Sequence, residues 1–190
     1  MADNYCTLQD VKDRLELTTT DATRDSNISL ILADVSRWIE NECGRFFYPS
    51  TETRYYTAVN TGVVNVDDLL SVTTLKTDGD GDRTYETTWS STDYDLMPYN
   101  HTPKRWIEIA PKGLYTFPLT RKGVQIIGSF GFATNVPGPI REACILKTVQ
   151  LYKRRASGQT TSTGNQAMGS NRTPTDSEIA AVLAPYRRRD

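Results

Sequence analysis

Residues 25–49 read DSNISLILADVSRWIENECGRFFYP and contain the clearest structural pattern in the chain. Apolar side chains recur there at intervals of three and four, at Ile28, Ile31, Leu32, Val35, Trp38, Ile39 and Cys43. This period predicts an amphipathic helix that is capped at its start by Asp25 or Ser26. Gly44 stands where a left-handed C-cap residue is wanted, so the helix is predicted to end there. One face of this helix must therefore pack on other elements.

Helices are predicted on both sides of this segment. Residues 7–10 (TLQD) form a capping box that begins a short helix before it. Far downstream, residues 137–139 (PGP) begin a third helix, which ends in the basic residues 153–155 (KRR). Cations suit that position because the C-terminal end of a helix carries partial negative charge. A last short helix is predicted after a cap at Thr175 or Asp176, and Pro185 stops it.

Between the second and third helices the sequence is rich in β-branched and aromatic residues that are separated by turn signals. Candidate strands are Arg54–Val59, Val63–Val66, Leu70–Lys76, Arg83–Trp89, Trp106–Ala110 and Val124–Phe130. Residues 60–62 (NTG) and 78–82 (DGDGD) are typical of hairpin loops. Strands this close in sequence favour antiparallel pairing, because a parallel crossover needs a dozen or more residues. The region is therefore predicted to form a small antiparallel sheet or an open barrel.

Together these patterns predict an α+β fold, in which a small bundle of about four helices carries an antiparallel β-rich insertion between its second and third helices. Residues 1–44 and 137–157 are expected to form the helical core, and residues 45–136 the insertion. Residues 158–174 are rich in Ser, Thr, Gly and Asn, a composition typical of a flexible linker. Residues 175–190 are expected to form the C-terminal helix and a basic tail.

The composition argues against most enzyme classes. Among its 190 residues the chain has one histidine and three cysteines, the latter widely spaced and without a C-x-x-C pair. Neither a disulfide framework nor a zinc finger is indicated, and no histidine-rich metal site is possible. No apolar run approaches the length of about 20 residues that spans a bilayer. We therefore expect a protein without enzymatic activity, cofactor, metal or membrane association.

Charge is distributed unevenly along the chain, although the formal net charge is only −1. Residues 1–44 carry four Lys/Arg against nine Asp/Glu, whereas residues 140–190 carry nine against four. A chain that is acidic at one end and basic at the other can attract a copy of itself or a charged partner. Two solvated surfaces without a partner would give the same pattern.

Three other features could carry chemistry, but each has a simpler explanation. Asp78, Asp80 and Asp82 resemble the start of a calcium loop, yet the pattern lacks the required Gly at its sixth position and Glu at its twelfth. A polar hairpin turn explains them better. His101 lies in a segment of loop composition, and the sequence identifies neither a nucleophile nor an orienting carboxylate for it.

Paired carboxylates are the third feature. Asp67 with Asp68, or Asp93 with Asp95, could in principle carry out acid–base chemistry. They lie at predicted strand ends, where turn formation explains them more simply.

Two basic clusters are the best candidate sites by local chemistry. They are Lys153, Arg154 and Arg155 at the predicted end of the third helix, and Arg187, Arg188 and Arg189 at the C-terminus. Arginine binds carboxylates and phosphates in bidentate fashion, so either cluster could dock on an acidic protein or face DNA. Helix ends and tails also carry solvated cations without any partner, and the sequence leaves both readings open.

The order of these elements resembles the head–tail connector, or adaptor, proteins of long-tailed bacteriophages. The residues that carry the resemblance cover most of the chain. They are 5–12 (YCTLQDVK), 38–39 (WI), 44–49 (GRFFYP), 66–72 (VDDLLSV), 94–96 (YDL), 98–100 (PYN), 136–137 (VP), 140–143 (IREA), 151–155 (LYKRR) and 183–188 (LAPYRR).

The resemblance implies a structural role in the virion neck, after assembly in the host cytoplasm. Such proteins form a homo-oligomeric ring, typically of twelve copies, beneath the portal protein. The ring extends the channel through which genomic DNA passes, and it presents a surface to a tail, stopper or tail-terminator protein. The C-terminal portion of the family commonly contacts the portal, which makes Leu183, Tyr186, Arg187, Arg188 and Arg189 the expected docking residues. The alternative is a basic nucleic-acid-binding module that uses the same clusters.

Overall fold

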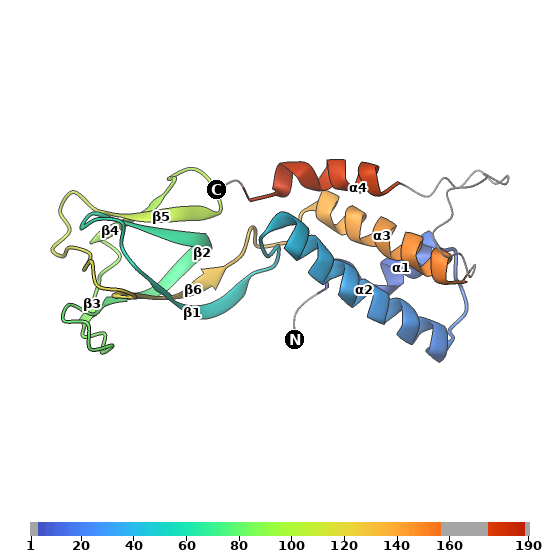
Figure 1. Ribbon diagram of the computed structural model, residues 1–190, viewed down its shortest axis with the longest axis horizontal. Helices are drawn as coiled ribbons and strands as arrows, with labels where there is room; N and C mark the ends of the chain where they lie inside the picture. The colour runs from blue at the N-terminus through green and yellow to red at the C-terminus, as the bar shows by residue number, and fades with distance from the viewer. Residues whose placement is uncertain (1–3, 157–174, 189–190) are drawn as a thin grey trace. The chain divides into compact units, whose positions relative to one another are not determined.

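The computed structural model describes residues 4–156 and 175–188 (Figure 1). Its elements follow the order that the sequence predicts, with two helices, a block of strands and two further helices. The helices are α1 (Leu8–Arg14), α2 (Ala22–Cys43), α3 (Gly138–Ala156) and α4 (Asp176–Leu183), and the strands are β1 (Ser50–Tyr56), β2 (Val63–Thr77), β3 (Thr87–Thr88), β4 (Tyr94–Met97), β5 (Lys104–Ile109) and β6 (Val124–Phe130). The mixed α+β class is confirmed.

The chain divides into two compact units. Residues 1–45 and 136–190 contribute the helical unit, which is thus built from two separate pieces of chain, and residues 46–135 form the β unit. The predicted linker at residues 158–174 lies outside the described residues. Within residues 4–156 and 175–188, no helix has both the length and the apolar character that a bilayer crossing requires.

The helix caps agree with the sequence at three ends and differ at one. Thr7 and Thr175 both form reciprocal capping boxes, with Asp10 and Glu178 respectively. Gly44 takes the left-handed conformation with φ 64°, which closes α2 as predicted. The prediction that Asp25 or Ser26 caps α2 is wrong, because the Asp21 carboxylate accepts the Arg24 N–H at 3.0 Å and the helix begins one turn earlier.

The core of the helical unit is mainly aliphatic. Helix α3 packs on α2, α1 and α4, so both pieces of chain contribute to one core. Its fully or largely buried apolar residues are Tyr5, Cys6, Val11, Ile28, Ile31, Leu32, Val35, Ile39, Cys43, Ile140, Ala143, Cys144, Ile145, Val149, Ile179 and Leu183. The apolar period that predicted α2 therefore identifies its buried face, except that Trp38 is only partly buried.

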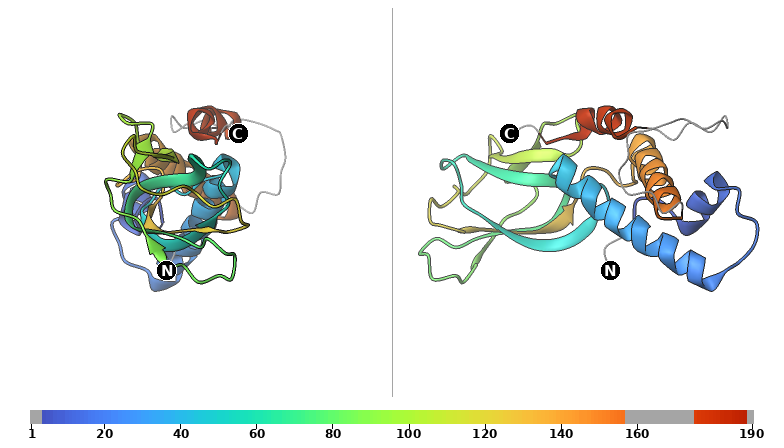
Figure 2. Two further views of the ribbon diagram at one scale, coloured as in Figure 1. Left: turned by 90° about the vertical axis from the view of Figure 1, so that its left-hand side faces the viewer. Right: turned by 45° about the vertical axis from the view of Figure 1, so that its right-hand side comes forward.

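The β unit is a six-stranded sheet in which every pairing is antiparallel. Its strand order is β1-β6-β2-β5-β4, and β3 pairs with β2 on the edge that faces β5, beyond the end of β5. Seen from one end, the sheet is strongly curved (Figure 2). Its core includes Leu69, Leu75, Trp89, Phe117, Ile126 and Phe130, with the Trp89 and Phe117 rings stacked at 4.6 Å. This is the small antiparallel sheet that the sequence predicts.

Several strand predictions are wrong in detail. The two strands expected at 63–66 and 70–76 are one long strand, β2. The register of its pairing with β5 shifts between Asn65 and Leu69, and that with β6 shifts after Leu69, so the strand continues through the polar residues that were expected to interrupt it. Strand β4 was not predicted. Residues 60–62 form a tight turn closed by an antiparallel bridge between Asn60 and Val63, but β1 and β2 do not pair as neighbouring strands, because β6 lies between them. The loop at 78–82 does belong to a hairpin, since β2 and β3 pair.

Candidate functional site

The C-terminal helix α4 positions most of the predicted docking residues. Ile179 and Leu183 are buried, and Leu183 has no exposed surface at all. At the start of the helix, Lys147 Nζ on α3 contacts Asp176 Oδ1 at 2.7 Å. The ammonium group of Lys147 holds the pKa of Asp176 below its usual value. The helix is therefore held on α3 by apolar contacts and by charge, and Leu183 anchors it rather than facing outward.

The chain just after α4 presents the exposed part of the predicted site. A 3-10 turn at Ala184–Tyr186 follows the helix, with Tyr186 half-buried and Arg187 and Arg188 exposed. The guanidinium group of Arg187 pairs with Glu42 near the end of α2. The backbone N–H of Arg188 donates to the carbonyl of Cys43 at 2.8 Å. These contacts fix this turn beside the C-terminal end of α2; Arg189 lies outside the described residues.

The second basic cluster lies at the end of α3. Lys153, Arg154 and Arg155 are all exposed, and Lys153 and Arg155 form no ion pair with another described residue. Arg155 also lines a hollow of about 620 Å³ between the end of α3 and the first turns of α2. Leu30, which is 61% exposed, and Arg24 lie on the opposite wall of this hollow.

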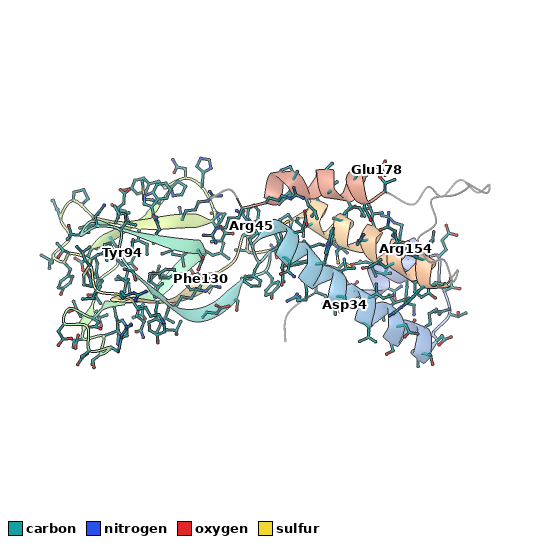
Figure 3. The ribbon with its side chains drawn as sticks, viewed as in Figure 1. Asp34, Arg45, Tyr94, Phe130, Arg154 and Glu178 are labelled. Carbon is teal, nitrogen blue, oxygen red and sulfur yellow. The ribbon has the colours of Figure 1, made fainter. Side chains whose placement is uncertain are left out.

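The two basic clusters lie at opposite ends of the helical unit. One is next to the last residues of α2, and the other is next to its first turns. Since α2 has 22 residues, these ends are roughly 33 Å apart at 1.5 Å per residue. Figure 3 shows the separation, with Arg154 at one end and Arg45, two residues after the end of α2, at the other. The two basic clusters therefore do not form one patch on a single copy.

Much of the uneven charge is neutralised inside the helical unit. Arg141 binds Asp10 at 2.6 Å, and Arg14 binds Glu142 at 2.7 Å. Each of these pairs, like that of Arg187 with Glu42, joins the acidic first piece of the chain to the basic last piece. The Arg141 guanidinium, together with the Thr7 donors, holds the pKa of the Asp10 carboxyl below its usual range. The charge asymmetry in the sequence thus serves contacts within the chain, which sequence patterns did not predict.

The acidic loop of the β unit is a self-capped turn. The two carboxylate oxygens of Asp78 accept the N–H groups of Gly81 and Arg83 at 2.7 and 2.9 Å. Burial raises the pKa of this carboxyl, but the backbone donors outweigh that effect and lower the pKa below its ordinary value. Asp80 and Asp82 accept further backbone N–H groups in the same loop. These hydrogen bonds explain all three aspartates, whose oxygens lie within 4.8 Å of one another.

The other candidates from the sequence are also explained locally. His101 is exposed in the loop between β4 and β5. Asp93 accepts the backbone N–H groups of Ser90 and Leu114 from two sides, as a turn residue does. Asp67 binds Arg54 at 3.0 Å and Tyr56 at 3.2 Å on the sheet surface.

Comparisons with known proteins agree with this architecture. No protein-family model matches the chain, and no curated protein is significantly similar to it. Among solved structures, a chain in the neck of an empty gene transfer agent (GTA) particle, computed with C6 symmetry, has a TM-score of 0.62 and 18% sequence identity; the match covers 98% of this chain and 91% of that one.

Two further chains give the same result. One belongs to the virion of a native GTA particle, with a TM-score of 0.59, 18% identity and coverage of 98% and 91% of the two chains. The other belongs to the neck of a native GTA particle computed with C12 symmetry, with a TM-score of 0.56, 18% identity and coverage of 100% and 96%. The chain thus shares, over nearly its whole length, the fold of proteins from the necks of phage-like particles. The expected structural resemblance is confirmed at the level of the fold.

Proposed function

We propose that this protein is a structural component of a virion neck, a head–tail adaptor that forms a homo-oligomeric ring. The observation that carries the proposal is the likeness to chains in particle necks, which spans both the helical and the β unit. Those necks were computed with C6 and C12 symmetry, so a ring of about twelve copies is the natural assembly. The role is geometric and needs no catalytic group.

The portal protein is the proposed partner of the turn after α4. Tyr186, Arg187 and Arg188 lie at the exposed end of a helix whose other contacts are internal. In docking, Arg187 would exchange its pairing with Glu42 for an acidic group of the portal. Leu183 would contribute by holding α4 in place. Arg189 remains a candidate on the basis of its sequence position alone.

The basic end of α3 then serves a different contact. Lys153 and Arg155, in the last turn of α3, lie next to the N-terminal end of α2, whereas Arg187 lies next to its C-terminal end. They would therefore not reach the same portal surface as Arg187 in one copy. In a ring, each copy presents two different faces to its neighbours. Exposed acidic residues of the first chain piece, such as Asp13 and Asp34, are available on a neighbouring copy. A tail, stopper or tail-terminator protein would bind another face of the ring, and genomic DNA would pass through the lumen.

The alternative is a nucleic-acid-binding module. A single copy offers two separated basic clusters rather than a continuous stripe, and three arginines are already paired with carboxylates. Affinity for DNA would have to come from few phosphate contacts, and it would fall steeply with added salt. The adaptor role uses the same arginines without requiring a continuous surface.

The test is to mix the purified protein with the portal protein encoded near it and to image the mixture by electron microscopy. The wild-type protein is expected to add a ring at one end of the portal. The double variant Arg187→Glu and Arg188→Glu should lose this docking. The matched control carries the same charge change at the other end of the helical unit, as Lys153→Glu and Arg155→Glu. It should still bind the portal, but its rings should remain incomplete. Thermal unfolding of each variant confirms that the fold is intact.

Free portal and free protein, at concentrations well above micromolar, would contradict the adaptor role. Equal loss of docking in both double variants would contradict the assignment of the α4 end to the portal. Retention of salt-sensitive DNA binding with no portal binding would favour the alternative.

A further inference from the structure

Two of the three cysteines meet in the core of the helical unit. Cys6 lies in a bend just before α1, and Cys144 lies in the first half of α3. Their sulfur atoms are 3.3 Å apart, although the residues are 138 positions apart in the chain. Both are buried, Cys6 with 6% of its surface exposed and Cys144 with none. The third cysteine, Cys43, lies at the end of α2 and is also a free thiol.

The surroundings distinguish the two thiols of this pair. The Cys6 thiol donates to Cys144, and this hydrogen bond together with burial raises the pKa of Cys6. The same hydrogen bond, with further polar contacts from Ser36 and Thr148, lowers the pKa of Cys144 despite its burial. Ser36 Oγ lies 3.6 Å from Cys144 Sγ. A thiol in such a setting ionises more readily than one surrounded by apolar groups.

We propose that Cys6 and Cys144 are a covalent modification site, at which a small disulfide oxidant such as oxidised glutathione forms an intramolecular disulfide. One of the two thiols loses its proton and attacks the oxidant as a thiolate, the S–S bond of the oxidant breaks, and one glutathione leaves as a thiol. The other cysteine then loses its proton, attacks the protein sulfur of this mixed disulfide and releases the second glutathione as a thiol. Two protein thiols become one disulfide, and one glutathione disulfide becomes two thiols.

Local structure allows the sulfur atoms to close the remaining distance. A disulfide needs about 2.05 Å between sulfur atoms, so the pair must approach by about 1.3 Å. Cys144 is held in α3, where Thr148 Oγ1 donates to its carbonyl at 2.7 Å. Cys6 precedes α1 and lies in no helix or strand, between Tyr5, whose hydroxyl donates to Glu40 at 2.8 Å, and Thr7, which caps α1. The approach of about 1.3 Å therefore has to come mainly from the two cysteine side chains.

The bond would fasten together the two pieces of chain that form the helical unit. Cys6 belongs to the first piece and Cys144 to the second, with the whole β unit between them in sequence. A cross-link over so long a segment removes much of the conformational freedom of the unfolded chain. The oxidised protein should therefore unfold at a higher temperature, by about 5 °C or more. This inference does not depend on the neck role, since it concerns the free chain.

The experiment incubates the native, fully reduced protein with oxidised glutathione and removes the reagent. Free thiols are then counted with a thiol-reactive dye after the protein is unfolded in denaturant, because all three cysteines are buried in the folded chain, and the mass of the intact chain is measured. We expect one free thiol instead of three, a monomer mass lower by two hydrogen atoms, and a peptide in which Cys6 is joined to Cys144. The thermal midpoint should rise and should return to its original value on reduction.

Two variants serve as controls. Cys6→Ser should keep Cys43 and Cys144 unlinked and should show no rise in midpoint after oxidation. Cys43→Ala should still form the bond, with no free thiol remaining. Three free thiols in the treated wild-type protein would overturn the proposal, as would a stable glutathione adduct, a disulfide that includes Cys43, or a covalent dimer. Each result is obtained without portal, so failure here is distinct from failure of the adaptor role.

Discussion

The helical unit and the β unit are stabilised in different ways. The β unit is one continuous segment, and it has an aromatic core in which Trp89 stacks on Phe117. The helical unit is assembled from two pieces that the β unit separates in sequence. It has an aliphatic core, and surface ion pairs such as Arg141 with Asp10 join the two pieces. One unit thus depends on contacts within a segment, and the other on contacts between distant pieces.

The difference has a consequence for folding, because the β unit brings its own ends together. The N–H of Phe132 donates to the carbonyl of Phe46 at 2.9 Å, and the rings of Phe47 and Phe132 pack at 5.5 Å. Closing a flexible loop of roughly 90 residues would cost about 4 kcal/mol plus a constant. Once the β unit is folded, the two pieces of the helical unit are held close together and are no longer separated by a flexible loop, so the helical unit does not bear this entropic cost when it folds. Damage to the β unit should therefore weaken both units, while damage to the helical unit should remain local.

The largest expected effect tests this asymmetry by truncating one core residue in each unit. Phe130→Ala removes a buried ring that contacts Tyr56 in the β unit and should cost about 3–5 kcal/mol. Ile39→Ala, in the helical core, should cost about 2–5 kcal/mol. Hydrogen exchange followed by mass spectrometry should show faster exchange in both units for Phe130→Ala, but only in the helical unit for Ile39→Ala. Faster exchange confined to the β unit for Phe130→Ala would contradict the coupling.

The next effect concerns the strand that holds the β unit together. A Cβ atom at Gly128 in β6 would lie 2.3 Å from the carbonyl oxygen of Ser71 in β2. Gly128→Ala should therefore push the two strands apart and cost about 1–3 kcal/mol in chemical denaturation. Gly138→Ala is the matched control, since nothing lies within 4 Å of its Cβ position at the start of α3. If both variants were equally stable, the close approach of β2 and β6 would be refuted.

A smaller effect is expected at the ends of the helices. Thr175→Ala removes the capping box that begins α4 and should cost about 1 kcal/mol. Because α4 is short, the loss should appear as local opening of residues 176–183 in hydrogen exchange, with the midpoint of the β unit unchanged. Thr7→Ala removes the equivalent cap of α1 and should open that helix instead. An unchanged exchange rate in α4 would show that packing alone holds this helix.

The smallest effect is a pH dependence that belongs to the helical unit. The pKa of Asp10 is lower in the folded chain than in the unfolded chain, chiefly because Arg141 binds it. Its contribution to stability is therefore fully present above the unfolded-state pKa of about 3.9, and it is lost as the pH falls through the folded-state pKa. Asp10→Asn should destabilise the protein near neutral pH by less than about 1 kcal/mol, and this difference should shrink toward pH 3.

Denaturation curves at several pH values measure this dependence. Asp13→Asn, on the same helix, is the control, because Asp13 accepts a hydrogen bond from the neutral Gln9 rather than from an arginine. A difference that stays constant from neutral pH to pH 3 would contradict the Asp10–Arg141 contribution.

The sequence predicts the candidate site only in part. It identifies both basic clusters and the helix that positions one of them, because charge runs and capping residues are visible within a few positions. It does not reveal that Glu42 pairs with Arg187, that Leu183 faces the core, or that the two clusters lie at opposite ends of α2. These facts depend on how α2, α3 and α4 align, which no short pattern encodes.

By itself, the sequence determines the four helices, their caps at Thr7, Gly44 and Thr175, and the α+β class. The physical reason is that helix periodicity and capping depend on residues three or four positions apart. Only the tertiary structure decides that β6 lies between β1 and β2, and that Cys6 meets Cys144. Such pairings join residues tens of positions apart, and they are selected by the packing of whole cores and by the closure of the intervening chain.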